Sequence, residues 1–214
     1  AATAAAAPPE EPPGVRPGRT GLRVMRPGVS VMPHVQNCGL AVAPTGIAAL
    51  NVDGYTIHRL FSFPLGVTEE TVRGGRYYPG RFAKALKELD TLIVDEASMV
   101  RADLFDALTA ALELYGPRPG TPFGGVQLVL VGGLYQLPPV VTDHEAGWIE
   151  GRFGTPFFFS ARSFDTATFP VVELGTVFRQ QGDDQLVHLL NEVREGTLPA
   201  DARAALNRRP AAEF

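Results

Sequence analysis

Two adjacent carboxylates that follow a short apolar run are the first candidates for chemistry. In TLIVDEASMV, Asp95 and Glu96 come directly after the run Thr91 to Val94. An aspartate at such a place can hold Mg²⁺ through water, and a glutamate can polarise an attacking water beside a terminal phosphate. The residues alone leave a second interpretation open, in which Asp95 caps the following helix and Glu96 is solvated at its first turn.

A neutral amide follows the next apolar run. In GGLYQLPPV, Gly132 to Val140, the amide of Gln136 could hydrogen-bond a phosphate or a water, and Pro138 and Pro139 would fix the backbone beyond it. An ordinary turn from glycine to proline explains the same residues. Gln136 therefore stays a candidate binding residue whose role this stretch alone does not decide.

Apolar runs that alternate with helical spacing must position these residues. The sequence predicts strands at LAVAP, TLIV, VQLVLV and VVEL, and helices at RFAKALKEL, MVRADLFDALTAALELYG and QLVHLLNEVREG. Strands that alternate with helices predict an α/β domain with a mainly parallel sheet. The continuous run VQLVLV is typical of a strand covered on both faces. In parallel sheets ligands bind at the carboxyl ends of the strands, where the APTG, DE and GG strings all fall.

Composition limits the classes of function. The chain has 214 residues, of which 45% are hydrophobic, so it has room for one large or two small domains. Its net charge of -4 gives no general field for polyanions, so any contact with nucleic acid must be local. The single cysteine, Cys38, lacks ligand neighbours at metal spacing, which favours a reduced compartment and an inert thiol. Without a membrane-length apolar run or a signal-peptide pattern, we expect an intracellular protein, cytoplasmic or, in a eukaryote, nuclear or mitochondrial.

Four strings in this order carry a resemblance to a known family. They are APTGIAALNVDGYTIHRLF, DEASMV, GGLYQLPPV and VFRQQGDDQLVHLLNEVREG. Together they resemble the PIF-like and RecD-like branch of the superfamily 1 DNA helicases, over about Leu40 to Arg208. The resemblance implies a RecA-like, P-loop NTPase type of parallel sheet flanked by helices, present here incompletely. It also implies ATP and Mg²⁺ as cofactors, and single-stranded DNA as a partner in replication, repair or recombination.

The resemblance assigns a role to individual residues of the nucleotide site. Asp95 would coordinate Mg²⁺, and Glu96 would activate water. Gln136 would link the γ-phosphate to elements that contact DNA. Arg179 would reach the nucleotide from the second RecA-like domain, where its permanently charged fork suits phosphate. From the residues alone, a surface position is the commoner one for an arginine such as Arg179.

The resemblance also implies where DNA would bind. Pro44, Thr45 and Gly46, together with His58, resemble the family's segments that contact single-stranded DNA. A threonine hydroxyl and exposed turn amides bind phosphate without adding net charge, which fits an acidic chain. His58 could instead be a core or surface histidine. Three aromatic residues could either stack on bases or pack in the core, of which packing is the commoner use: Tyr55, Phe61 and Phe63.

Three departures from the family pattern qualify these expectations. The phosphate-binding loop should be a glycine-rich turn that ends in Gly-Lys-Ser or Gly-Lys-Thr, a few tens of residues before APTG. The nearest candidate is Arg16 to Met25, which has no lysine, and the chain's lysines are Lys84 and Lys87. Gly133 stands where the family usually has an aspartate. The chain also stops at Phe214, early in what would be the second domain.

Two functional hypotheses follow, with one division of the chain. Residues 1–39 are expected to be irregular or foreign to the gene, residues 40–174 to form the first RecA-like domain without its phosphate loop, and residues 175–214 to begin the second. The first hypothesis is a fragment of an ATP-dependent DNA helicase that is weakly active or inactive alone. The second is a degenerate RecA-like module that binds DNA or a protein without ATPase activity. Protein partners are not specified by the sequence.

Overall fold

A parallel sheet organises the chain in the computed structural model, which describes residues 23–24, 38–167, 169–174 and 184–207. The described part has five strands, and every pair is parallel. They are β1 (Arg23–Val24), β2 (Cys38–Ala43), β3 (Tyr55–Thr56), β4 (Thr91–Val94) and β5 (Gln127–Leu130). The spatial order is β1-β2-β4-β5, and β3 pairs with the end of β2. The α/β fold with a parallel sheet is thus confirmed.

Helices connect the strands and extend beyond them. The α-helices are α1 (Gly46–Asn51), α2 (Ile57–Phe61), α3 (Glu69–Arg73), α4 (Ala83–Lys87), α5 (Ala102–Tyr115), α6 (Asp143–Phe153), α7 (Asp184–Glu195) and α8 (Ala200–Asn207). Short 3₁₀ turns are η1 (Gly80–Phe82), η2 (Ala97–Met99), η3 (Pro122–Gly125) and η4 (Phe158–Ser160). No helix in the described ranges has both the length and the apolar character that crossing a bilayer requires.

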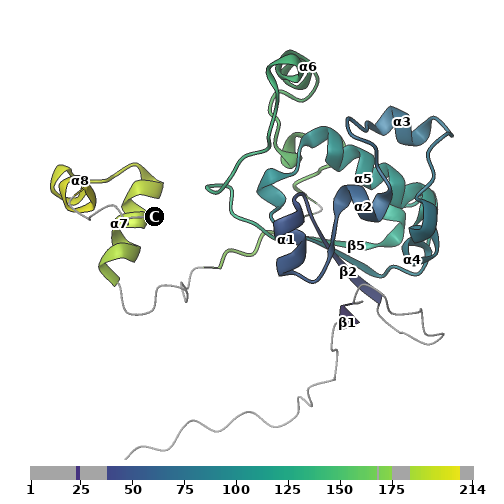
Figure 1. Cartoon of the computed structure of the whole chain (residues 1–214), viewed down its shortest axis with the longest axis horizontal. Coiled ribbons are helices and arrows are strands. Elements are labelled where there is room, and N and C mark those ends of the chain that lie inside the picture. The colour runs from purple at the N-terminus through teal and green to yellow at the C-terminus, as the bar shows by residue number, and fades with distance from the viewer. Residues whose placement is uncertain (1–22, 25–37, 168, 175–183, 208–214) are drawn as a thin grey trace, which may run out of the picture.

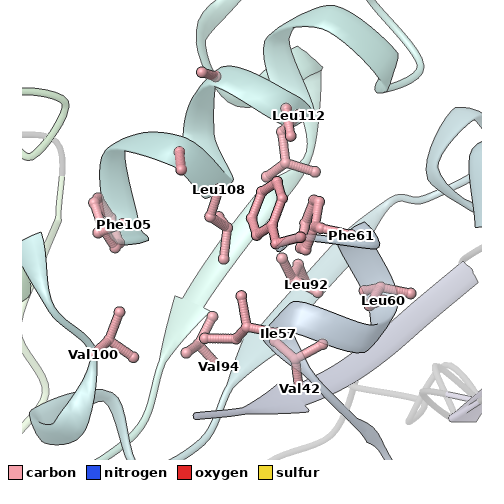
Figure 2. Close-up of a cluster of buried hydrophobic side chains, with 14 of the residues drawn as sticks. Val42, Ile57, Leu60, Phe61, Leu92, Val94, Val100, Phe105, Leu108 and Leu112 are labelled. Atoms are coloured by element: carbon pink, nitrogen blue, oxygen red, sulfur yellow. The ribbon is translucent and has the colours of Figure 1, made fainter. Parts of the chain in front are cut away.

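The hydrophobic core lies between the sheet and the helices on one of its faces. Helices α2, α3, α4 and α5 all lie on this side in Figure 1. Strands that follow one another across the sheet in chain order, with right-handed crossovers, place their helices on the same face. Leu92 and Val94 of β4 point into this core, where Leu108 and Leu112 of α5 cover them (Figure 2).

The opposite face of the sheet is less covered by the described residues. Ile93 and Val129 alternate with the core-facing positions of β4 and β5, and both are half-buried. Val131, just beyond β5, is 44% exposed. The prediction that VQLVLV is covered on both faces is therefore wrong for β5, where Gln127 is exposed and Leu128 to Leu130 are half-buried. The reason is that β5 lies at the end of the described sheet.

Most predicted elements exist, with informative differences. RFAKALKEL forms the turn η1 followed by the short helix α4, rather than one continuous helix. VVEL is not a strand: Val171 to Leu174 have no regular structure and make no ladder with a described strand. β2 begins at Cys38, two residues before the expected Leu40. QLVHLLNEVREG is confirmed as the main part of α7.

Candidate functional site

The turn that follows β4 joins the carboxyl ends of three strands. The amide of Asp95 donates a hydrogen bond to the carbonyl oxygen of Val42 in β2, over 2.8 Å. The amide of Ala97 donates to the carbonyl oxygen of Val131 beyond β5, over 2.9 Å. Gly132 fits closely against this turn, because a Cβ atom there would lie 3.0 Å from the nitrogen of Ala97. The strings APTG, DEAS and GGLYQ, separated in sequence, therefore meet at one edge of the sheet.

The two carboxylates lie on this turn, and both residues are half-buried. Glu96 has φ 50° and ψ 44°, the left-handed region that residues with a Cβ atom adopt only at a cost. The turn η2 that follows has Glu96 at its N-cap position and no side-chain cap. The interpretation in which Asp95 caps the following helix is therefore wrong. The backbone instead holds both carboxylates at the end of β4 without using them as caps.

Gln136 lies on a turn in the loop that leaves β5. Its backbone amide donates to the carbonyl oxygen of Gly133 over 2.9 Å, and its side chain is exposed. A Cβ atom on Gly133 would lie 3.4 Å from Cδ of Gln136, an ordinary contact distance. The loop has room for the aspartate that the family pattern expects at Gly133. The structure thus brings Gln136 to the same edge of the sheet as Asp95 and Glu96.

The predicted DNA contacts begin at the end of β2. Thr45 is half-buried and caps α1, since its Oγ1 accepts a hydrogen bond from the amide of Ala48 over 3.3 Å. Pro44 is half-buried, whereas Gly46 is exposed with open space around it. The hydroxyl oxygen of Thr45 therefore serves the helix first, and the exposed backbone at Gly46 is the accessible part of this segment.

His58 lies in α2 and is half-buried. Its ring meets the ring of Phe63 edge-on, with 6.4 Å between the centroids. Burial lowers the pKa of His58 from 6.5, and the nearby carboxylate of Asp103 opposes this shift. The imidazole is therefore uncharged at neutral pH, so it can offer a hydrogen bond but no fixed positive charge to a phosphate.

An arginine–aromatic cluster next to His58 was not singled out from the sequence. The guanidinium of Arg59 lies 5.6 Å from the ring centroid of Tyr55, and that of Arg81 lies 4.8 Å from the ring centroid of Phe82. The two rings meet edge-on at 5.1 Å, and both arginines are exposed. The sequence feature that could have revealed this cluster is an arginine next to an aromatic residue, as in GRF. Two further aromatics belong to the core, as favoured from the sequence: Phe61 and Phe63.

An ionic contact fixes the helix that follows the Gln136 loop. Arg101, just before α5, pairs with Asp103 and with Glu145 of α6, each at 2.7 Å. Thr142 and Glu145 form a capping box at the start of α6. Hydrogen bonds from Thr142 and Arg101 lower the pKa of Glu145 to about 2. The carboxylate therefore stays ionised over the whole physiological range, and the far end of the loop is held near the start of α5.

The described residues fit the implied cofactor only in part. Asp95 and Glu96 have the chemistry of a magnesium ligand and a water-activating base. No described group of three or more His, Cys, Asp or Glu residues could hold a metal without further ligands. Gly132 adjoins the turn of these carboxylates, but in the described ranges no lysine accompanies it as in a phosphate-binding loop, so this means of holding the phosphates of ATP is missing there. Arg179 and most of Arg16 to Met25 lie outside the described residues.

Comparison with known proteins gives consistent matches. The family model described as PIF1-like helicase matches residues 23–203. The ATP-dependent DNA helicase PIF1 of Candida albicans is 35% identical over 168 residues, which is 76% of this chain and 18% of that protein. The same helicase of Emericella nidulans is 37% identical over 161 residues, or 73% of this chain and 20% of that protein.

Solved structures agree with these matches. The crystal structure of Bacteroides Pif1 bound to ssDNA has a TM-score of 0.72 and 34% identity, covering 82% of this chain and 42% of that one. The Bacteroides Pif1 complex with ADP-AlF3 and ssDNA has a TM-score of 0.74 and 33% identity, covering 85% and 42%. The chain therefore spans less than half the length of these solved relatives and about a fifth of the curated ones.

Proposed function

Because the chain belongs to the PIF1-like helicase family, we propose that it forms part of an ATP-dependent DNA helicase of replication, repair or recombination. Residues 40–174 would form the first RecA-like domain, and residues 175–214 would begin the second. The observation that carries the proposal is the meeting of the APTG, DEAS and GGLYQ strings at the carboxyl ends of β2, β4 and β5. An intracellular compartment that holds DNA would be its place of action.

We assign the residues at the candidate nucleotide site the roles that the family resemblance implies. Asp95 would ligate Mg²⁺, Glu96 would activate water, and Gln136 would relay the state of the nucleotide to the DNA side. Arg179 would contribute from the second domain. A solved relative holds ADP-AlF3 and ssDNA together, which supports a nucleotide site and a DNA site on this fold. ATP hydrolysis would require phosphate-binding groups that the described residues do not supply, so we expect little ATPase activity from this chain by itself.

Binding of single-stranded DNA is the activity that the described residues support best. The exposed backbone at Gly46, the neutral ring of His58 and the arginine–aromatic cluster all lie on segments that follow β2. Arg59 and Arg81 supply positive charge beside aromatic faces, the combination that proteins use to hold single strands without sequence preference. Local charge of this kind compensates for the net charge of -4.

Fluorescence anisotropy with a labelled oligo(dT) strand at several salt concentrations tests this proposal. We expect Arg59→Gln and Arg81→Gln each to weaken binding and to reduce the slope of log K against log salt by about 0.7, the value for one phosphate contact on a single strand. Arg118→Gln is the matched control, because Arg118 is bonded to Gly125, just before the amino end of β5, at the opposite edge of the sheet. No binding by the wild-type chain, or equal slopes for all three variants, would contradict the proposal.

A degenerate module without ATPase activity is the second candidate. The observation that favours it is the absence of lysine outside Lys84 and Lys87, together with Gly133 in the Gln136 loop. The degenerate module would bind DNA or a protein and would hydrolyse no ATP, whereas the helicase fragment would bind DNA and retain at most weak hydrolysis. A DNA-stimulated ATPase activity that disappears in Glu96→Gln would exclude the degenerate module and would show that the site is complete.

A further inference from the structure

The loop that carries Gln136 has few internal contacts. Between Gly132 and Val141 the described structure has a single hydrogen bond, from the amide of Gln136 to the carbonyl oxygen of Gly133. The atoms nearest to a Cβ on Gly133 would all belong to Gln136, so the loop turns on itself there and not on a neighbouring element. Two consecutive glycines also leave the start of the loop conformationally free. The position of Gln136 therefore depends on support from outside the loop.

The same loop exposes apolar side chains on both sides of Gln136. Tyr135 is 79% exposed and Leu137 is 66% exposed, and Val140 is exposed further along. Exposed apolar side chains that occur together mark interaction surfaces more often than single ones do. Because Tyr135 and Leu137 adjoin Gln136 in the chain, a segment that covers them also restrains Gln136.

Helix α7 reaches this surface. The guanidinium of Arg194 lies 5.7 Å from the ring centroid of Tyr135, within the range of a cation–π contact. In Figure 1, α7 and α8 lie apart from the sheet. The contact therefore joins α7 to the Gln136 loop across a distance in sequence, and it identifies α7 as the segment that meets Tyr135.

The face of α7 around Arg194 has the composition that the loop requires. Leu190, Val193 and Arg194 are three and four residues apart, so they lie on one face of the helix, and all three are exposed. This face offers apolar side chains beside one cation. The loop offers apolar Leu137 beside the aromatic face of Tyr135. The two surfaces are therefore complementary in both apolar character and charge.

We propose that α7 docks on the Gln136 loop through Arg194 and Tyr135, with the apolar face of α7 packing on Leu137, and that this docking positions Gln136. Tyr135 and Arg194 are then positioning residues, because they act through Gln136 and not on a substrate. The docking would pass movements of residues 175–214 to the candidate nucleotide site. This inference rests on the role proposed above for Gln136, but it is measured without nucleotide or DNA, so the two can fail separately.

A nitroxide label on Ala200→Cys reports the docking in the full 214-residue chain. Ala200 is exposed at the start of α8, whereas the natural Cys38 is buried, so the label is directed to position 200. In NMR spectra the label should broaden the amide signals of Gly133 and Gln136. A mixture of isotope-labelled chain without nitroxide and unlabelled chain with nitroxide should show no such broadening, because the contact lies within one chain.

Substitutions at both partners test the contact, and each changes an exposed side chain. Arg194→Gln and Tyr135→Ser should each lower the ratio of docked to undocked chains about two- to fivefold, as expected for an exposed cation–π contact. Arg194→Lys and Tyr135→Phe keep the cation and the ring, so they should restore most of the broadening. The double variant should lose little more than Tyr135→Ser alone, because both substitutions remove one contact. Arg203→Gln, at an exposed arginine of α8, is the matched control and should change nothing.

Hydrogen exchange at the amide of Gln136 measures the positioning separately from the docking. The docked helix restrains the turn in which this amide bonds to the carbonyl oxygen of Gly133. The amide should therefore exchange about two- to fivefold faster in Arg194→Gln and Tyr135→Ser, in proportion to the lost docking. In Arg194→Lys and Tyr135→Phe its exchange should return toward the wild-type rate.

The docking is overturned by the absence of broadening at Gly133 and Gln136, by broadening that passes between separate chains, or by equal effects of Arg194→Gln and Arg203→Gln. Broadening between chains would show that a second copy covers the loop. The positioning role is overturned if the Gln136 amide exchanges at the wild-type rate in Arg194→Gln and Tyr135→Ser while the broadening is lost.

Discussion

At the scale of single residues, the sequence indicates which side chains could do chemistry, but it does not indicate the backbone conformation that holds them. The types of Asp95, Glu96 and Gln136 are compatible with a nucleotide site but also with a helix cap and an ordinary turn, and it is the order of the four strings that favours the nucleotide site. The left-handed backbone of Glu96 is not predictable in the same way, since glycine, asparagine or aspartate normally signal that conformation. Its cost is borne by the contacts that join the turn to β2 and β5.

The lowered pKa of His58 gives a prediction for stability against pH. The unfolded chain binds a proton near pH 6.5 and the folded chain binds it only at lower pH, so stability falls as the pH drops through 6.5. His58→Gln removes this component. Between about pH 8 and pH 5.5, urea unfolding should show a smaller loss of free energy for His58→Gln than for the wild type.

The exposed His144 of α6 provides the control for this measurement. His144→Gln makes the same substitution at an exposed position, so it shows how much of any change comes from replacing a histidine by glutamine as such. If His58→Gln and the wild type lose the same free energy between the two pH values, the imidazole of His58 is not buried as described.

At the scale of elements, the hydrophobic period of the sequence correctly predicts the strands and helices that pack in the core. It predicts wrongly where a segment has no neighbour to pack or pair with. TLIV and the α5 segment were predicted correctly because their apolar positions meet in one core. VVEL has equal strand propensity, but among the described residues it has no neighbouring strand with which to form a ladder. α4 is shortened to five residues after η1. The arginine–aromatic cluster was missed because its members come from segments 22 residues apart, Arg59 and Arg81.

Helix α6 depends on ionic contacts, because Ile149 is its one buried residue. It stands apart from the body in Figure 1, with Arg101–Glu145 and Arg152–Glu70 as its ion pairs. Glu145→Gln keeps a residue suited to the capping box and removes the charge that Arg101 binds. The ratio of chains with α6 undocked to chains with α6 docked should rise roughly twofold, as expected for loss of about 0.5 kcal/mol, and quenching of Trp148, the only tryptophan in the sequence, follows this rise.

The exposed Glu150 of the same helix gives the matched control, and Glu150→Gln should leave the quenching unchanged. In the wild type the pKa of Glu145 is about 2, so its pairing is present above pH 4.5 and is lost as the pH falls through about 2. Trp148 quenching that changes already between pH 7 and 5 would show that another group holds α6.

At the scale of the whole molecule, the two faces of the sheet are unequal. The helices that cover one face leave Ile93, Val129 and Val131 incompletely covered on the other. Exposed apolar surface beside an open strand edge favours association between copies. Val131→Lys should therefore raise the concentration at which light scattering detects aggregates, by roughly twofold or more.

Val140→Lys adds the same charge in the Gln136 loop, where the side chain is 73% exposed and lies off the sheet. It separates the effect of net charge from that of the sheet face. An equal shift for Val131→Lys and Val140→Lys would mean that total charge, and not the uncovered face, controls association.

The order β2-β4-β5 has a consequence for biosynthesis. Among these three, each strand lies beside the one of the three that was made before it, so none of them has to be inserted between two that are already paired. α5 covers the growing layer before β5 is made. At synthesis rates of about 5–20 residues per second, each unit has seconds to find its neighbour. The layer β2-β4-β5 can therefore grow in the direction of translation, with its open edge on the side of the newest of these three strands.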